Sequence, residues 1–147
     1  MSYDLSKPLV IGISSRALFN LEQENKIFEE QGVEAYEAYQ VAHENEILQK
    51  GAAFQLIKAF LELNNTELGR LVEVIIMSRN NANTCLRIFN SIQYYGLDIT
   101  RATLTSGAEI APYLKAFKTD LFLSANSVDV QSAINDGIAA GRILTGD

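Results

Sequence analysis

The chain has 147 residues, of which 48% are hydrophobic and 20% charged, as expected of one ordinary globular domain. Its formal net charge of −6 argues against binding to nucleic acid, because that binding depends on Lys and Arg side chains that neutralise phosphates. The same charge argues against an anionic membrane surface. Cys85 is the one cysteine, which excludes an internal disulfide and fits a reducing compartment. Residues 1–8 lack the basic start and apolar run of a signal peptide, so we expect a soluble, cytoplasmic protein.

Four short apolar runs are typical of buried β-strands. They are Leu9–Ile13, Val72–Met77, Ala102–Thr105 and Leu121–Ser124. Residues 74–77 show no alternation of apolar and polar residues, as expected of a strand covered on both faces. Because helical patterns separate the runs, the sequence predicts a three-layer α/β sandwich with a mostly parallel, Rossmann-like sheet.

Helices are predicted where apolar residues recur at three- and four-residue spacing. Residues 81–95 form one such pattern and stop at Gly96, a residue that suits the position just past a helix end. Residues 128–140 form the last pattern and stop near Gly141.

A longer helical interval separates the first two strands. It predicts three helices, at about residues 21–31, 33–44 and 52–63. Since a parallel crossover needs only about a dozen residues, we interpret about residues 20–66 as a cap-like helical insert in a single domain, beside the turn that begins at Ser14.

Polar residues follow the first two strands. Ser14, Ser15 and Arg16 follow the first, and Ser78-Arg79-Asn80 follows the second. Ligands of open α/β sheets gather outside the carboxyl ends of the strands, and hydroxyl and guanidinium groups can hold an anion. The alternatives are a surface ion pair for Arg16 and a helix N-cap formed by the residues after the second strand.

Polar residues at the other strand ends favour capping. Thr105 and Ser106 are expected to cap the next helix, although contact with a ligand is the alternative. Ser127 is a plausible N-cap of the last helix, and Asn126 suits a turn.

His43 is the only histidine, so a site with several histidine ligands is excluded. Its position in Ala42-His43-Glu44-Asn45 is typical of a helix C-terminus. Cys85 lies in an apolar helix stripe and is predicted to be a small core residue rather than a nucleophile. The sequence has neither a Gly-x-Gly-x-x-Gly motif nor a Walker lysine motif.

Several separate segments, in order along the chain, resemble the cytosolic 5′-nucleotidase type I family. They are residues 10–19, 30–36, 43–46, 90–94, 113–117, 121–125 and 133–140. The resemblance implies a haloacid-dehalogenase-like fold and the hydrolysis of nucleoside 5′-monophosphates with Mg²⁺ and an aspartyl-phosphate intermediate. Longer members of the family look like two related halves, and this chain is similar to the earlier, non-catalytic half.

The resemblance places the family's functional positions on residues of different chemistry. Its nucleophilic aspartate falls on Ser14 and its general-acid aspartate on Arg16, while its phosphate-binding Ser/Thr falls on Ser78. Its lysine falls near Ile110, and Lys115 is close in sequence without a match. Its metal-binding acidic pair falls on Ser124 and Ala125, and its His-Glu-Asn segment is here His43-Glu44-Asn45. We therefore expect no catalytic residue, no metal site and no cofactor in this chain.

These substitutions lead to three hypotheses. The first is a family member that has lost catalysis and binds phosphate or a nucleoside monophosphate through Ser14, Ser15, Arg16, Ser78, Arg79 and Asn80, with His43, Glu44 and Asn45 as further candidates. Such a chain would support a catalytic half or subunit, or self-associate. The second is a pseudo-phosphatase interaction module with no ligand. The third is an unrelated, metal-independent enzyme that uses His43 and Glu44.

Overall fold

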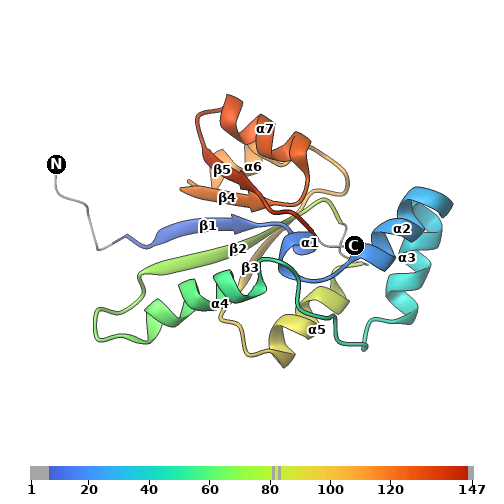
Figure 1. Ribbon diagram of the computed structural model, residues 1–147, viewed down its shortest axis with the longest axis horizontal. Coiled ribbons are helices and arrows are strands. Elements are labelled where there is room, and N and C mark those ends of the chain that lie inside the picture. Colours follow the sequence, from blue (N-terminus) through green and yellow to red (C-terminus); the bar gives the residue numbers. More distant parts are fainter. Residues whose placement is uncertain (1–6, 81, 83, 146–147) are drawn as a thin grey trace.

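The computed structural model describes residues 7–80, 82 and 84–145. Its centre is a five-stranded parallel sheet with the strand order β3-β2-β1-β4-β5 (Figure 1). The strands are β1 (Leu9–Ile13), β2 (Val72–Ser78), β3 (Arg101–Leu104), β4 (Leu121–Ser124) and β5 (Ala139–Arg142). The predicted α/β class with a mostly parallel, Rossmann-like sheet is confirmed.

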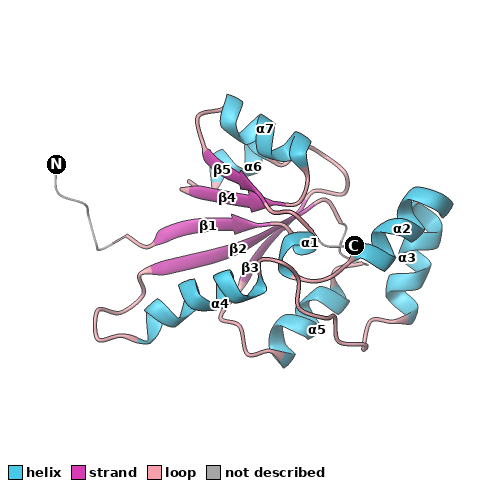
Figure 2. Cartoon of the chain, in the orientation of Figure 1, coloured by secondary structure: helices cyan, strands magenta, loops and turns pink. Residues whose placement is uncertain are grey.

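Helices cover both faces of this sheet (Figure 2). They are α1 (Ser15–Leu18), α2 (Glu22–Gln31), α3 (Val33–Ala42), α4 (Phe54–Glu62), α5 (Leu86–Tyr94), α6 (Ala111–Ala116) and α7 (Ser127–Asn135), with a 3-10 turn at Leu63–Asn65. Within β2, Val74 and Ile76 belong to the core that includes residues of α4 and α5, whereas Ile75 and Met77 belong to the core on the side of α6 and α7. Burial on both faces explains the unbroken apolar run of this strand.

The helices between β1 and β2 have two different positions. Helix α4 packs on the sheet through buried Phe54, Ile57 and Leu61, as a crossover helix does. The hairpin formed by α2 and α3 stands beyond the carboxyl ends of the strands, where the arrowhead of β1 points (Figure 1). One part of the interval is therefore an ordinary crossover, and the other part is placed to cover the edge of the sheet where ligands bind in such folds.

Two buried side chains tie the hairpin to the sheet layer. Arg87 of α5 donates from Nη1 to the Glu24 carboxylate of α2 and to the Gln40 amide oxygen of α3, both at 3.1 Å. Its Nε donates to the carbonyl oxygen of Glu46 at 2.9 Å. Because Arg87 and Glu24 are only 6% and 4% exposed, this buried ion pair anchors the α2–α3 hairpin to α5.

The last part of the chain differs from its prediction. Helix α7 ends at Asn135 rather than near residue 140, and the residues that follow form the edge strand β5. Gly137 has φ +82°, and its N–H donates to Ile134 while that of Ile138 donates to Ala133. This pair of bonds is the Schellman ending of a helix, so Gly137, not Gly141, is the stop signal.

Helix α5 ends as predicted but begins later. Its N-terminus is Leu86, not residue 81, and Asn81 itself lies outside the described residues. Asn and Thr side chains, which make up most of residues 80–84, compete for backbone hydrogen bonds and favour turns over helix interiors. Gly96 with φ +68° follows the helix end, as the sequence predicted.

Capping residues were only partly predicted. Asn126, not Ser127, caps α7 by accepting hydrogen bonds from the N–H groups of Val128 and Asp129. Thr105 and Ser106 do not cap α6, whose N-cap is Ile110. The Thr105 hydroxyl donates instead to the carbonyl of Ala108.

None of the helices in the described part of the chain has the length and apolar character that a membrane span requires.

Candidate functional site

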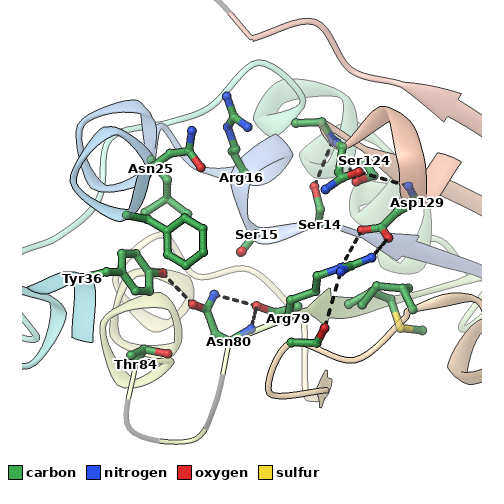
Figure 3. Close-up of a pocket in the computed structure, with 18 of the residues that line it drawn as sticks. Ser14, Ser15, Arg16, Asn25, Tyr36, Arg79, Asn80, Thr84, Ser124 and Asp129 are labelled. Carbon is green, nitrogen blue, oxygen red and sulfur yellow. Dashed lines mark hydrogen bonds and ion pairs between the residues drawn. The ribbon is translucent and has the colours of Figure 1, made fainter. Parts of the chain in front are cut away.

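A pocket of about 500 Å³ lies between the carboxyl edge of the sheet and the α2–α3 hairpin (Figure 3). Such a volume is typical of sites for small molecules. The lining combines strand-end loops with hairpin residues: Ser14, Ser15, Arg16, Leu21, Asn25, Phe28, Val33, Tyr36, Glu37, Met77, Ser78, Arg79, Asn80, Thr84, Ser106, Gly107, Ile110, Ser124, Ala125, Asn126 and Asp129. All six candidates from the first two strand ends are thus brought together.

Ser14 lies where the chain's path through the sheet reverses direction. Strands β1 and β4 are neighbours, yet the chain leaves β1 towards β2, which makes this edge a topological switch point. The Ser14 hydroxyl accepts hydrogen bonds from the N–H groups of Ala17 and Ala125, both at 3.2 Å, and Ser14 is the N-cap of α1. The Ser14 hydroxyl therefore joins the ends of β1 and β4.

The backbone of Gly51 packs closely against the C-terminal end of the short helix α1. A Cβ atom at this position would lie 2.7 Å from the carbonyl carbon of Phe19 and 2.8 Å from the carbonyl oxygen of Ala17, so a side chain cannot be accommodated without a backbone shift. The N–H of Gly51 also donates to Leu18. This close approach positions the turn that carries Ser15 and Arg16.

A hydrogen-bonded chain connects the hairpin to the end of β2. The Tyr36 hydroxyl donates to Asn80 Oδ1 at 2.6 Å, and Asn80 Nδ2 donates to Ser78 Oγ at 2.7 Å. Burial is the main cause that raises the pKa of Tyr36 above its ordinary value, so the phenol stays protonated and can donate. Ser78 is not the N-cap of α5, which is Cys85; the Ser78 hydroxyl accepts hydrogen bonds from Asn80.

Arg79 is ion-paired within the pocket. Its Nη2 contacts Asp129 Oδ1, its Nε donates to Asp129 Oδ2 at 3.3 Å, and its Nη1 lies 3.5 Å from the carbonyl oxygen of Gly107. The Asp129 side chain is 7% exposed and that of Arg79 is 38% exposed. The pocket therefore contains a bidentate guanidinium–carboxylate pair (Figure 3), in which the guanidinium is the more exposed member.

Arg16 forms a second ion pair at the rim. Its Nε and Nη2 each donate to the Glu22 carboxylate at 3.1 Å. The hydrogen bond from Arg16 is the largest cause that lowers the pKa of Glu22. The ion-pair interpretation of Arg16 agrees with this geometry, although the partner belongs to the hairpin and the arginine still lines the pocket.

The His-Glu-Asn segment lies away from this pocket. His43 is the C-cap of α3, and its ring stacks on Tyr39 with 3.9 Å between centroids. Its Nδ1 is 2.7 Å from the Tyr39 carbonyl oxygen, and its Nε2 is 3.5 Å from Glu46. His43, Glu44 and Asn45 are not among the lining residues, so the structure does not bring them together with Ser14 or Arg79.

Other positions taken from the resemblance also have defined environments. Ile110 is buried in the pocket wall, whereas Lys115 lies outside the lining and is 4.0 Å from Asp136. Ser124 and Ala125 line the pocket at the end of β4. Cys85 is buried, and desolvation raises the pKa of its thiol to about 11, which suits the predicted core residue.

Sequence reasoning missed several lining residues. Asp129 lies in the first turn of α7, beyond the polar residues that directly follow the strands. Counting three residues on from an Asn N-cap would have found it, since acidic residues favour that turn. Asn25, Phe28 and Tyr36 belong to the hairpin, and no local motif marks them; only the fold brings them to the pocket.

Fold and pocket together define a doubly wound α/β protein with a polar pocket at its switch point. The 5′-nucleotidase family model matches residues 1–147, and the chain therefore belongs to the 5′-nucleotidase family. It is similar to human cytosolic 5′-nucleotidase 1B, with 40% identity over 145 residues that cover 94% of this chain. The chain spans 24% of the length of that relative. No solved structure matches it.

Proposed function

We propose that this chain is a non-hydrolysing part of a 5′-nucleotidase family protein, with a haloacid-dehalogenase-like fold, that binds the phosphate group of a nucleoside monophosphate. The observation that carries the proposal is the guanidinium of Arg79 in a polar pocket at the switch point of the sheet. Guanidinium groups bind phosphate oxygens in a bidentate manner. The cytosolic name of the relative supports a cytoplasmic location.

The two ends of the pocket suit the two ends of a nucleotide. Hydroxyl and guanidinium groups gather at the strand ends, among them Ser14 and Arg79. The hairpin supplies apolar and aromatic surface, including Phe28 and Tyr36, whose rings meet edge to face at 5.9 Å between centroids. A polar end with an apolar end is the usual composition of a small-molecule site, and here it supports a ligand with a phosphate and a base.

The donor set does not fit the Mg²⁺ that the family mechanism uses. Mg²⁺ binds carboxylate oxygens together with waters and phosphates. The matched positions carry the hydroxyls of Ser14 and Ser124 and the methyl of Ala125, and the Asp129 carboxylate is engaged by Arg79. Among the residues described, no group of three or more His, Cys, Asp or Glu side chains could hold a metal ion.

Ser14 is also a poor nucleophile in this setting. Its hydroxyl caps α1 and accepts two backbone hydrogen bonds, and His43, the only histidine, lies outside the pocket lining. A serine without an adjacent base reacts weakly. Loss of the nucleophile alone costs on the order of a million-fold in kcat in a hydrolase where it was measured. We therefore expect binding without turnover.

Two assays on the purified chain test the proposal. Titration calorimetry with AMP, IMP and inorganic phosphate is expected to show saturable binding that weakens in Arg79→Met. A phosphate-release assay with AMP and Mg²⁺ is expected to show no turnover above background. The absence of heat at millimolar ligand would overturn the binding function, and metal-dependent release of phosphate would overturn the non-hydrolysing one.

A docking module is the second candidate. Val41 of α3 and Leu86 and Phe89 of α5 are 40–48% exposed and line a shallow groove, which suits an interaction surface. The occupant that we propose is a catalytic half of the same family. Co-purification of the two halves, weakened by Leu86→Glu with nucleotide binding unchanged, would support it. Co-purification that is equally strong in Leu86→Glu would exclude this groove.

A further inference from the structure

The guanidinium of Arg79 is already occupied on one edge. Its hydrogen bonds to Asp129 and Gly107 use one N–H on each of its three nitrogens. Arginine has five such groups, so two are not engaged by any described residue and can bind a ligand. Any phosphate that binds Arg79 must either share it with Asp129 or displace the carboxylate.

Asp129 is the fixed partner of this pair. It lies in the first turn of α7, where the helix dipole favours a carboxylate, and its N–H donates to the capping side chain of Asn126 at 3.1 Å. Its side chain is 7% exposed, whereas that of Arg79 is 38% exposed. Arg79 extends from the loop after β2, whereas the backbone of Asp129 is held in the capped first turn of α7.

We propose that Asp129 is an internal competitor for anions at Arg79 and thereby sets the affinity of the pocket for phosphate. The inference rests on the proposed function and names the residue that limits it. This competing carboxylate is built into the fold, because the first turn of α7 both lines the pocket and carries Asp129.

The physical reason is that Coulomb energy falls only as the inverse of distance. A phosphate on the two remaining N–H groups of Arg79 lies close to the Asp129 carboxylate, so repulsion from the carboxylate cancels most of the attraction to the guanidinium. Glu37 also lines the pocket, and Glu22 pairs with Arg16 at its rim. These three carboxylates outnumber the two arginines, so the pocket offers a phosphate no net positive charge. Removal of the carboxylate at Arg79 is expected to have the largest effect.

The test is Asp129→Asn, which removes the charge and keeps the size of the side chain and an acceptor at the helix start. We expect inorganic phosphate and AMP to bind at least about tenfold more tightly than to the wild type, because the carboxylate that repels them is gone; tenfold corresponds to about 1.4 kcal/mol. A second readout is the rate at which phenylglyoxal modifies Arg79, measured by mass spectrometry. It is expected to rise when the carboxylate no longer covers the guanidinium.

The matched control is Asp136→Asn. Asp136 follows the C-terminal end of the same helix, is exposed, and lies outside the pocket lining. This variant changes the net charge by the same amount and is expected to bind phosphate as the wild type does. In the double variant Asp129→Asn/Arg79→Met, the gain is expected to disappear.

The outcomes separate this inference from the proposed function. If the wild type binds AMP and Asp129→Asn binds it no more tightly, the inference fails and the function stands. If the wild type binds nothing and Asp129→Asn binds phosphate, the inference stands and the native function fails. If neither binds, both are overturned. Weaker binding by a folded Asp129→Asn would show instead that Asp129 orients Arg79, which also overturns the inference.

Discussion

Two arginine–carboxylate pairs in this protein have the same chemistry and opposite surroundings. Arg87 and Glu24 lie between the hairpin and α5, and both side chains are at most 7% exposed. In the Arg79–Asp129 pair only the carboxylate is buried, and the guanidinium opens to the pocket. The first pair connects three helices and a loop, whereas the second occupies the place where a ligand would bind.

The two environments distinguish a pair that maintains the architecture from a pair that can respond to a ligand. A buried pair is strongly destabilised when one member is lost, because the other charge is left without compensation. A pair with one exposed member can exchange its partner for water or for an anion at much lower cost. We therefore expect the hairpin to be held in a fixed position over a pocket whose charge is adjustable.

The largest expected effect is that of Arg87→Met. It leaves the Glu24 carboxylate buried, and Glu24 Oε2 already lacks a hydrogen-bond partner among the described residues. We expect a loss of about 3–5 kcal/mol in the free energy of unfolding, measured by urea denaturation. The double variant Arg87→Met/Glu24→Met is expected to recover part of this loss, because neither charge then remains. A loss below about 1 kcal/mol for the single variant would show that the pair does not anchor the hairpin.

The Arg79–Asp129 pair is expected to give a smaller and asymmetric effect. Arg79→Met leaves the buried Asp129 carboxylate without its partner and should lower the free energy of unfolding by about 1–3 kcal/mol. Asp129→Asn leaves a guanidinium that water can reach and should cost less. Urea denaturation of both variants checks this order. Equal costs, or a larger cost for Asp129→Asn, would mean that the two members are buried to the same degree in solution.

The sheet could be predicted from the sequence because its strands carry their own signal. β1 and β4 have the predicted bounds, and burial on both faces makes such runs continuous. β5 was missed because Ala139-Ala140-Gly141 has little strand character and because Ile138 continued the apparent helical stripe. The same type of helix ending was recognised at Gly96 and overlooked at Gly137, where a nearby second glycine, Gly141, drew the prediction away.

The pocket could be predicted only on its sheet side. Parallel strands place their carboxyl ends on one edge, so Ser14 and Arg79 were expected to lie near each other. Tyr36 and Asp129 reach the pocket through the path of the hairpin and the rotation of α7, which depend on packing between distant parts of the chain. His43 resembled a site residue by its type, yet the helix that carries it directs it to Tyr39 and Glu46.

A further variant, Tyr36→Phe, tests whether the hairpin is also held at the pocket. It removes the hydroxyl that donates to Asn80 at 2.6 Å, and we expect a loss of about 1 kcal/mol in the free energy of unfolding. Tyr113→Phe, at an exposed residue of α6, is the matched control and should change little. Faster amide exchange in α3 of Tyr36→Phe alone would locate the effect in the hairpin.

The smallest effect is expected from the rim pair of Arg16 and Glu22. The hydrogen bond from Arg16 lowers the pKa of Glu22 in the folded protein below its ordinary value of 4.5. The pair therefore contributes stability above about pH 4.5, and this contribution is lost as the pH falls through the folded-state pKa. Because both side chains are about one-third exposed, solvent screening keeps the contribution below about 1 kcal/mol.

Glu22→Gln isolates this contribution, since the amide keeps the shape and cannot titrate. The difference in free energy of unfolding between the wild type and Glu22→Gln should be small at pH 7 and should shrink towards zero as the pH is lowered below 4.5. Added salt should reduce the difference at pH 7, as it does for exposed pairs. A difference that grew on acidification would mean that the Glu22 pKa is raised by burial instead, and the rim pair would then resemble the buried pair of Arg87 rather than differ from it.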